Sequence, residues 1–357
     1  MSSFELALVS VIVRSVGRPS LEAALASIAL QDNCRIEVLI VAASGAEHPS
    51  VPRRAGPHLI RLVASATPLT RPVAANAGLD AASGDWITFL DDDDRLLPGH
   101  ISGLMQAAER HGAKVVHSFA RAVFADGRVE RVGRPFSLIQ LYEHNYIQLS
   151  TALIAREFVA AGCRFDEALP ILEDWDFFLQ LAQRTPFHFV PLQSFEWHAD
   201  VGTSGASVGA NKNEVLFAAM RDRVHEKWRV EHEALIDDVR LALANASAAA
   251  ASGALEPAAT YCRDAMRRSP NDPHILSFLA MLAKRTGQLD DAFRLQQAAV
   301  SVRPDDADLH FNLASILLAL GRRDAARAAL SNALRCDPKH VNAKSRLAAL
   351  DVTQAPG

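Results

Sequence analysis

The last third of the chain carries a 34-residue period, and this period restricts the fold more than any other feature of the sequence. A glycine, a proline and two alanines each recur with the same step. The positions are Gly253, Gly287 and Gly321; Pro270, Pro304 and Pro338; Ala258, Ala292 and Ala326; and Ala265, Ala299 and Ala333. Glycine permits a tight turn, alanine lets helices cross closely, and proline ends a helix. The period therefore predicts stacked helix pairs, each burying an apolar face against the next.

This pattern resembles the tetratricopeptide repeat, a helix-turn-helix unit of 34 residues. We expect an all-α domain over 237–357, with repeats at 237–270, 271–304 and 305–338 and a capping helix at 339–350. The resemblance implies a surface for a protein partner or for a homodimer. The alternatives are a purely structural appendage and an alanine-rich bundle with coincidental spacing.

The first 232 residues alternate apolar strand-like runs with amphipathic helices. Such alternation predicts an α/β domain with a mostly parallel sheet and helices on both faces. The expected strands include residues 6–13, 36–42, 59–63, 86–90 and 114–124. Ser20 is the expected N-cap of the first helix, Asp126-Gly127 predicts a hairpin, and the glycine- and serine-rich loop that ends at Gly209 is a candidate lid.

Four consecutive carboxylates, Asp91 to Asp94, follow the expected strand 86–90 directly. Ligands of open α/β sheets bind at the carboxyl ends of strands. Adjacent carboxylates repel one another, and a divalent cation relieves that repulsion. An all-oxygen ligand set suits Mg²⁺ or Mn²⁺. The alternative is a solvated acidic loop that caps the following helix.

Five segments, in this order, resemble the inverting, family 2 glycosyltransferases. They are VSVIVRSVGRPSLEAALASIALQ, IEVLIVAASG, PVAANAGLDAASGDWITFLDDDDRLLPGH, EDWDFFLQLA and WHADVGTSGAS. The resemblance implies that residues 1–232 form a GT-A (nucleotide-diphospho-sugar transferase, Rossmann-like) domain. It also implies a hexosyltransferase-type activity from a nucleotide-sugar donor to a glycan, lipid-linked or protein acceptor.

The same resemblance assigns roles to carboxylates and one histidine. Asp91 and Asp93 match the DXD motif and, with His198, are the expected ligands of Mn²⁺ or Mg²⁺. Asp174 matches the general base, beside Glu173 as a second catalytic carboxylate. Read without the resemblance, Glu173 and Asp174 favour the dipole of the helix that they open and cap its free N–H groups.

The expected nucleotide-sugar-binding residues lie in the first 100 positions. They are Arg14, Ser15, Arg18, Arg71, Asn76, Asp91 and Asp92. Arg14 and Arg18 either bind phosphate or only fix their loop, and Asn76 either binds donor or holds its helix against the metal loop. The loop lacks the family's base-stacking aromatic, and the second strand gives Ala42-Ala43-Ser44 where an aspartate is common. The identity of the base is therefore left open.

Composition and charge argue against some classes of function and indicate a location in the cell. A net charge of −4 argues against broad nucleic-acid binding. The sequence contains no apolar run of about 20 residues, so we expect no membrane span. The four scattered cysteines and the start without a signal peptide favour the cytoplasm, a location that peripheral contact with the inner face of the membrane would also fit.

Two rival functions stay open at this stage. One is a non-catalytic adaptor, in which a decayed transferase domain is carried by the repeats, and the altered nucleotide loop motivates it. The other is a nucleotidyltransferase, which shares the sheet and the acidic cluster. That class usually has a glycine-rich basic loop after the first strand, and this chain has only Arg14, Gly17 and Arg18 there.

Overall fold

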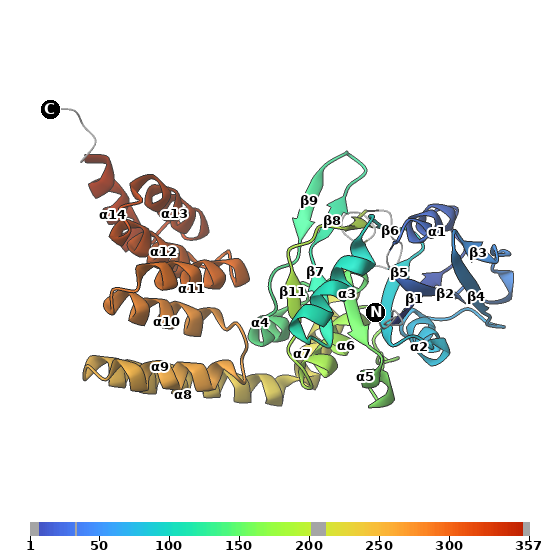
Figure 1. The fold of residues 1–357 in the computed structure, drawn as a ribbon, viewed down its shortest axis with the longest axis horizontal. Coiled ribbons are helices and arrows are strands. Elements are labelled where there is room, and N and C mark those ends of the chain that lie inside the picture. Colours follow the sequence, from blue (N-terminus) through green and yellow to red (C-terminus); the bar gives the residue numbers. More distant parts are fainter. Residues whose placement is uncertain (1–6, 33, 201–211, 353–357) are drawn as a thin grey trace, which may run out of the picture. The chain divides into compact units, whose positions relative to one another are not determined.

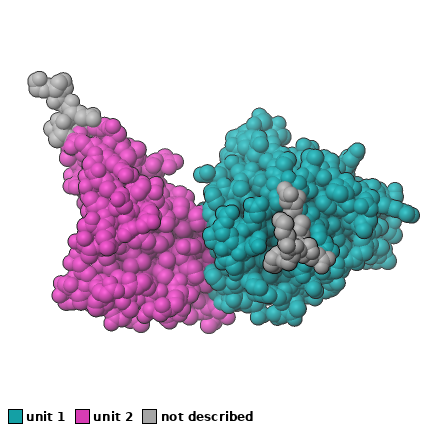
Figure 2. All heavy atoms as spheres, in the orientation of Figure 1, with its two compact units in different colours: residues 1–134, 141–228 teal, residues 135–140, 229–357 magenta. Residues whose placement is uncertain are grey.

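The computed structural model describes residues 7–32, 34–200 and 212–352. The chain divides into two compact units (Figure 2). Unit 1 comprises Met1–Arg134 and Leu141–Trp228, and unit 2 comprises Pro135–Gln140 and Arg229–Gly357. Most of the loop predicted as a lid falls in 201–211 and so lies outside the described residues. No helix among the described residues is long and apolar enough to cross a membrane.

Unit 1 is built, in its described part, on an eight-stranded mixed sheet with the order β11-β7-β10-β5-β1-β2-β4-β3 (Figure 1). The strands are β1 (Leu8–Ser15), β2 (Arg35–Ala42), β3 (Arg54–Ala55), β4 (His58–Val63), β5 (Trp86–Asp91), β7 (Val115–Ser118), β10 (Ala152–Ala155) and β11 (His188–Val190). β1 runs parallel to β2 and β5, and β10 runs antiparallel to β5 and β7. The central strands are parallel, so their carboxyl ends meet at one edge.

The central strand β1 is buried on both faces, which explains its continuous apolar sequence. Val9, Val11 and Val13 share a core with α1 (Leu21–Ala29) and α3 (His100–His111). The opposite face, at Ile12, meets α2 (Arg71–Ala81). A Cβ at Gly78 of α2 would collide with Ile12, so glycine allows this helix to lie close to the sheet. The predicted N-cap Ser20 makes no capping hydrogen bond with its side chain.

A second sheet of unit 1 has the order β6-β12-β8-β9 among the described residues. Its strands are β6 (Arg95–Leu96), β12 (Phe195–His198), β8 (Ala120–Val123) and β9 (Val129–Val132). The prediction of one strand over 114–124 is wrong, because the chain leaves the first sheet after β7 and joins the second as β8. The predicted hairpin is confirmed: β8 pairs antiparallel with β9, and Gly127 has φ +83°.

The remaining elements of unit 1 are η1 (Gly45–Glu47), α4 (Leu138–Glu143, which begins in unit 2), η2 (Leu149–Thr151), α5 (Glu157–Ala160), α6 (Glu173–Ala182) and α7 (Glu214–Lys227).

Unit 2 contains helices α8 to α14, stacked as pairs (Figure 1). They are α8 (Arg229–Ala251), α9 (Leu255–Met266), α10 (Pro273–Arg285), α11 (Leu289–Val302), α12 (Ala307–Ala319), α13 (Arg323–Cys336) and α14 (Val341–Val352). The periodic glycines turn the chain within each pair at φ +85°, +79° and +74°. The segment Pro135–Gln140 also belongs to this unit, and the carbonyl of Phe136 accepts a hydrogen bond from Nδ2 of Asn271 at 2.8 Å.

The periodic alanines are buried where helices pack together. Ala258, Ala292 and Ala326 are each 0% exposed. Ala326 shares a core cluster with Ala314 of α12 and Ala343 of α14. A larger side chain at such a position has no room without moving a helix.

We predict that Ala326→Leu lowers the free energy of unfolding of the repeat unit by about 1–3 kcal/mol, because the added methyl groups overpack the helix crossing. The neighbouring Ala325 is exposed, and Ala325→Leu serves as the matched control, with an expected change within about 0.5 kcal/mol. Urea unfolding followed by circular dichroism measures both values. Equal effects of the two substitutions would contradict the packing role of Ala326.

Candidate active site

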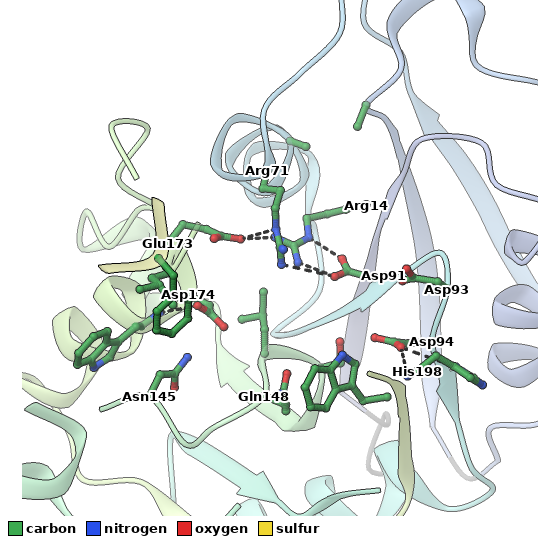
Figure 3. A pocket seen from close by; sticks show the side chains of 18 of the residues that line it. Arg14, Arg71, Asp91, Asp93, Asp94, Asn145, Gln148, Glu173, Asp174 and His198 are labelled. Atoms are coloured by element: carbon green, nitrogen blue, oxygen red, sulfur yellow. Dashed lines mark hydrogen bonds and ion pairs between the residues drawn. The ribbon is translucent and has the colours of Figure 1, made fainter. Parts of the chain in front are cut away.

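A cleft of about 470 Å³ opens at the carboxyl ends of β1 and β5. One wall carries Asp91, Asp93 and Asp94, and the start of α6 contributes Glu173 and Asp174 to the same cleft (Figure 3). The volume lies in the range of ordinary small-molecule sites. Carboxylates that lie at least 79 residues apart in the sequence (173 − 94 = 79) therefore line one cavity.

Arg14, at the end of β1, joins the two groups of carboxylates. Its guanidinium donates to both oxygens of Asp91, at 2.8 and 2.9 Å, and its Nη1 donates to Oε1 of Glu173 at 2.8 Å. The Arg14 side chain is 7% exposed and that of Glu173 is 1% exposed. Burial opposes the charge of Arg14, but Asp91 and Glu173 outweigh this effect and raise the pKa of Arg14. These bonds fix Arg14 within the site, and its side chain also lines the cleft.

The loop after β1 is held by Asp92, which is 0% exposed. Oδ2 of Asp92 accepts hydrogen bonds from Oγ of Ser15 and from the backbone N–H of Val16, both at 2.9 Å. Oδ1 of Asp92 accepts one from Nη1 of Arg18 at 2.5 Å. Ser15 and Asp92, predicted to bind the donor, thus bond each other and do not line the cleft. Arg18 does line it, with a side chain 28% exposed.

The acidic run provides a candidate cation site. Asp91, Asp93 and Asp94 each offer one oxygen, and these oxygens lie within 4.8 Å of one another. Arg14 and Arg71 lower the pKa of Asp91 despite its burial. Burial, with repulsion from neighbouring carboxylates, raises the pKa of Asp93 and raises that of Asp94 to about 7. A divalent cation would remove this repulsion, so the residues fit Mn²⁺ or Mg²⁺.

Asp94 is the cluster member that the sequence analysis did not assign to the metal. Its Oδ1 accepts a hydrogen bond from the backbone N–H of His198 at 2.9 Å and lies 3.9 Å from Nδ1 of that ring. The Nδ1 atom is buried and has no hydrogen-bond partner among the described residues. Asp94 raises the pKa of His198. An orphaned ring nitrogen beside a carboxylate cluster is compatible with the predicted role of His198 as a ligand.

The predicted base Asp174 follows a residue with an unusual backbone. Leu172 has φ +61°, one of two non-glycine residues with positive φ among those described. This conformation costs about 1–2 kcal/mol, and strained residues cluster at functional sites. Leu172 lines the cleft, and α6 begins immediately after it with Glu173 and Asp174.

Glu173 and Asp174 differ in their surroundings. Oε1 of Glu173 accepts hydrogen bonds from both Arg14 and Arg71, at 2.8 and 3.1 Å. Asp174 accepts from the backbone N–H of Trp175 at 2.8 Å, and its carboxylate turns toward the open space of the cleft (Figure 3). Burial, together with the charge of Glu173, raises the pKa of Asp174 to about 6. Glu173 is therefore occupied by two cations, whereas Asp174 has the properties of a proton acceptor near neutral pH.

The two other predicted donor-binding residues, Arg71 and Asn76, differ in position: only Arg71 lines the cleft. Arg71 lines the cleft with a side chain 34% exposed, and its Nη2 lies 3.8 Å from Asp91. Asn76 exchanges hydrogen bonds with the backbone N–H and carbonyl of Phe165, both at 3.0 Å, and is not among the cleft-lining residues. Asn76 thus joins α2 to the segment before α6.

Comparison with known families gives two matches. The model described as "Glycosyl transferase family 2" matches residues 10–166, and that described as "Tetratricopeptide repeat" matches residues 283–350. With the α/β sheet of unit 1 and the helix pairs of unit 2, these matches confirm the predicted fold class and the resemblance on which it rested.

Several curated proteins are similar to this chain in sequence. "Uncharacterized glycosyltransferase YwdF" from Bacillus subtilis is 30% identical over 235 residues, covering 61% of this chain and 83% of that protein. "Succinoglycan biosynthesis protein ExoO" from Rhizobium meliloti is 29% identical over 173 residues, covering 44% of this chain and 49% of that protein. The chain thus spans about half the length of ExoO. "GalNAc(5)-diNAcBac-PP-undecaprenol beta-1,3-glucosyltransferase" from Campylobacter jejuni is 60% identical over 40 residues, covering 11% of this chain and 13% of that protein.

We predict that Arg14→Ala lowers the free energy of unfolding of unit 1 by about 3 kcal/mol, because it leaves buried Glu173 and part-buried Asp91 with Arg71 as their remaining cationic partner. Arg53 is exposed, and Arg53→Ala is the matched control, expected to change stability by less than about 0.5 kcal/mol. Guanidinium unfolding measures both variants. A loss in Arg14→Ala no greater than that in the control would show that the bridge does not hold the site.

Proposed function

The chain belongs to glycosyl transferase family 2, and from this premise we propose that it transfers a sugar from a nucleotide-sugar donor with inversion at the anomeric carbon. In such a displacement the acceptor oxygen attacks from the face opposite the leaving nucleoside diphosphate. The reaction needs a group that accepts the acceptor's proton and a second group that holds the leaving diphosphate. The proposal rests most directly on the presence of Asp174 and the acidic cluster in one cleft.

Asp174 is the proposed general base. Its carboxylate faces the cleft, and burial is the main cause that raises its pKa to about 6. The group is therefore ionised at neutral pH and still basic enough to accept a proton. Glu173, predicted as a second catalytic carboxylate, is proposed to act through its position instead. Its charge raises the pKa of Asp174, and its carboxylate is held in place by Arg14 and Arg71.

The donor diphosphate is proposed to lie against the opposite group of residues. Asp93 and Asp94, with His198, would hold Mn²⁺ or Mg²⁺. A bound divalent cation would neutralise charge on the leaving diphosphate. Arg71 and Arg18 line the cleft with partly exposed guanidinium groups, which suit direct hydrogen bonds to phosphate oxygens. Asp91 is proposed to support the site through its two bonds to Arg14, and its oxygens keep lone pairs with which it could also contact the cation.

The repeat unit is proposed to recruit a protein, either a partner or a second copy of this chain. Tetratricopeptide repeats stack into extended concave surfaces of the kind used for binding. This role is separate from the chemistry of unit 1, because every residue proposed for catalysis lies in unit 1.

Asp174→Asn is expected to reduce turnover by roughly 10²–10⁴-fold, the usual contribution of a general base. Binding of a nucleoside diphosphate with Mn²⁺ is expected to persist, because the amide keeps the size of the side chain. Radiolabelled sugar transfer or donor hydrolysis measures the first quantity and a thermal-shift titration the second. The exposed hairpin residue Asp126 provides the matched control, Asp126→Asn. Turnover of Asp174→Asn within a few-fold of wild type would refute the assignment.

The pH dependence of kcat/KM should follow the ionisation of Asp174. The raised pKa means that the carboxyl is protonated, and inactive as a base, below about pH 6. The rate should therefore rise about tenfold per pH unit on the acid side of that value and level off above it. Steady-state rates between about pH 4.5 and 8 measure the profile. A profile that is flat across this range, or one that Asp174→Asn leaves unshifted, would be inconsistent with this base.

A further inference from the structure

The cleft has a third side that the donor and base do not use. Residues 145–148, between α4 and η2, alternate in exposure: Tyr146 and Ile147 are 6% and 2% exposed, whereas Asn145 and Gln148 are only partly buried and line the cleft. Figure 3 shows the polar ends of Asn145 and Gln148 turned toward the space that Asp174 faces. The buried pair anchors this segment, so the two amides are presented from a fixed support.

These amides have hydrogen-bonding capacity left over. Oδ1 of Asn145 accepts from the backbone N–H of Ile147 at 3.1 Å, while its Nδ2 has no partner among the described residues. The side chain of Gln148 likewise has none there. An amide offers both a donor and an acceptor. Both groups are uncharged.

Trp197 of β12 adds an aromatic surface to the cleft. Its side chain packs partly against the core that contains Phe195 and partly lines the cavity. Its indole N–H has no hydrogen-bond partner among the described residues. A large ring fixed on one side by the core offers contact area at small entropic cost.

A buried histidine, His100, contacts both the segment that follows Gln148 and the segment that precedes Trp197. Nε2 of His100 lies 3.2 Å from the carbonyl of Ser150, two residues after Gln148, and Nδ1 lies 2.9 Å from Oγ of Ser194, three residues before Trp197. Burial lowers the pKa of His100 to about 4, so the ring is neutral. A carbonyl can only accept, so Nε2 donates to Ser150 and Nδ1 accepts from the Ser194 hydroxyl. His100 thereby fixes the distance between the amide segment and the tryptophan strand.

We propose that Asn145, Gln148 and Trp197 form an acceptor subsite for a neutral sugar ring, and hence that the acceptor is a carbohydrate and not a protein side chain. A pyranose has an apolar face of C–H groups, which suits the indole, and an edge of hydroxyls, which suits amides that can both donate and accept. This placement leaves one sugar hydroxyl beside Asp174, where its proton is removed. The inference rests on the proposed function, because it takes Asp174 as the base.

The test measures binding directly by saturation-transfer difference NMR on the full chain with UDP, GDP or dTDP and Mn²⁺. The probes are methyl β-glucoside, methyl β-galactoside and methyl β-N-acetylglucosaminide, with a serine-containing peptide as the competing acceptor class. We expect at least one glycoside to bind and the peptide not to bind. Gln148→Ala and Trp197→Ala should each weaken glycoside binding about tenfold, equivalent to one or two lost contacts. Trp197→Phe should retain binding within about threefold, because it keeps an aromatic face.

Gln106, exposed on α3, provides the matched control Gln106→Ala, which should bind like the wild type. The thermal shift caused by nucleoside diphosphate and Mn²⁺ should be equal in wild type, Gln148→Ala and both Trp197 variants. Binding of the peptide, binding of no glycoside, or glycoside binding that survives Gln148→Ala and Trp197→Ala would overturn the subsite. Loss of the nucleotide-induced shift in these variants would assign the residues to the donor and would also overturn it. Failure of the proposed function is distinct, since wild type would then show no nucleotide-induced shift.

Discussion

The active-site arrangement depends on one buried guanidinium. Arg14 leaves the end of β1 and binds both oxygens of Asp91, which ends β5, and one oxygen of Glu173, which begins α6. Glu173 is 1% exposed and Asp91 is part-buried, so a cation between them offsets the repulsion of their like charges. Because Arg14, together with Arg71, contacts both carboxylates, the acidic cluster and the start of α6 are held in one cleft.

The same electrostatics sorts neighbouring carboxylates into different roles. The pKa of Asp91 is low because two arginines face it, while that of Asp94 is raised to about 7 and that of Asp174 to about 6, each mainly by burial. Groups whose environments separate their pKa values can divide the tasks of a reaction between them. Asp91, Asp93 and Asp94 together fit a cation, Asp91 is also bonded to Arg14, and Asp174 fits a proton acceptor. Asn145 and Gln148, which are uncharged, line the same cleft.

Sequence patterns predicted the elements that depend on local order, and they were weakest for long-range pairing. The repeat period predicted the helix pairs, since glycine turns and alanine crossings are local requirements. The pattern of a strand followed by an acidic run predicted that the aspartates lie at one edge of the sheet. The side-chain partners of Arg14 could not be read from sequence, because Asp91 and Glu173 lie 77 and 159 residues away from it. For the same reason the sequence did not show that Asp92 bonds the loop after β1 and that Asn76 bonds Phe165. Asn145 and Gln148 carry no motif, and only the fold shows that they face the cleft.

Locating the bound cation and nucleotide would test directly whether the acidic cluster and Asp174 serve one active site. Crystals of the protein grown with Mn²⁺ and a nucleoside diphosphate would give an anomalous signal from the metal. We expect that peak within coordination distance of Asp93 and Asp94, the diphosphate beside it and Arg71, and the Asp174 carboxylate across the same cavity. A metal bound elsewhere, or Asp174 separated from the nucleotide by protein, would contradict the account.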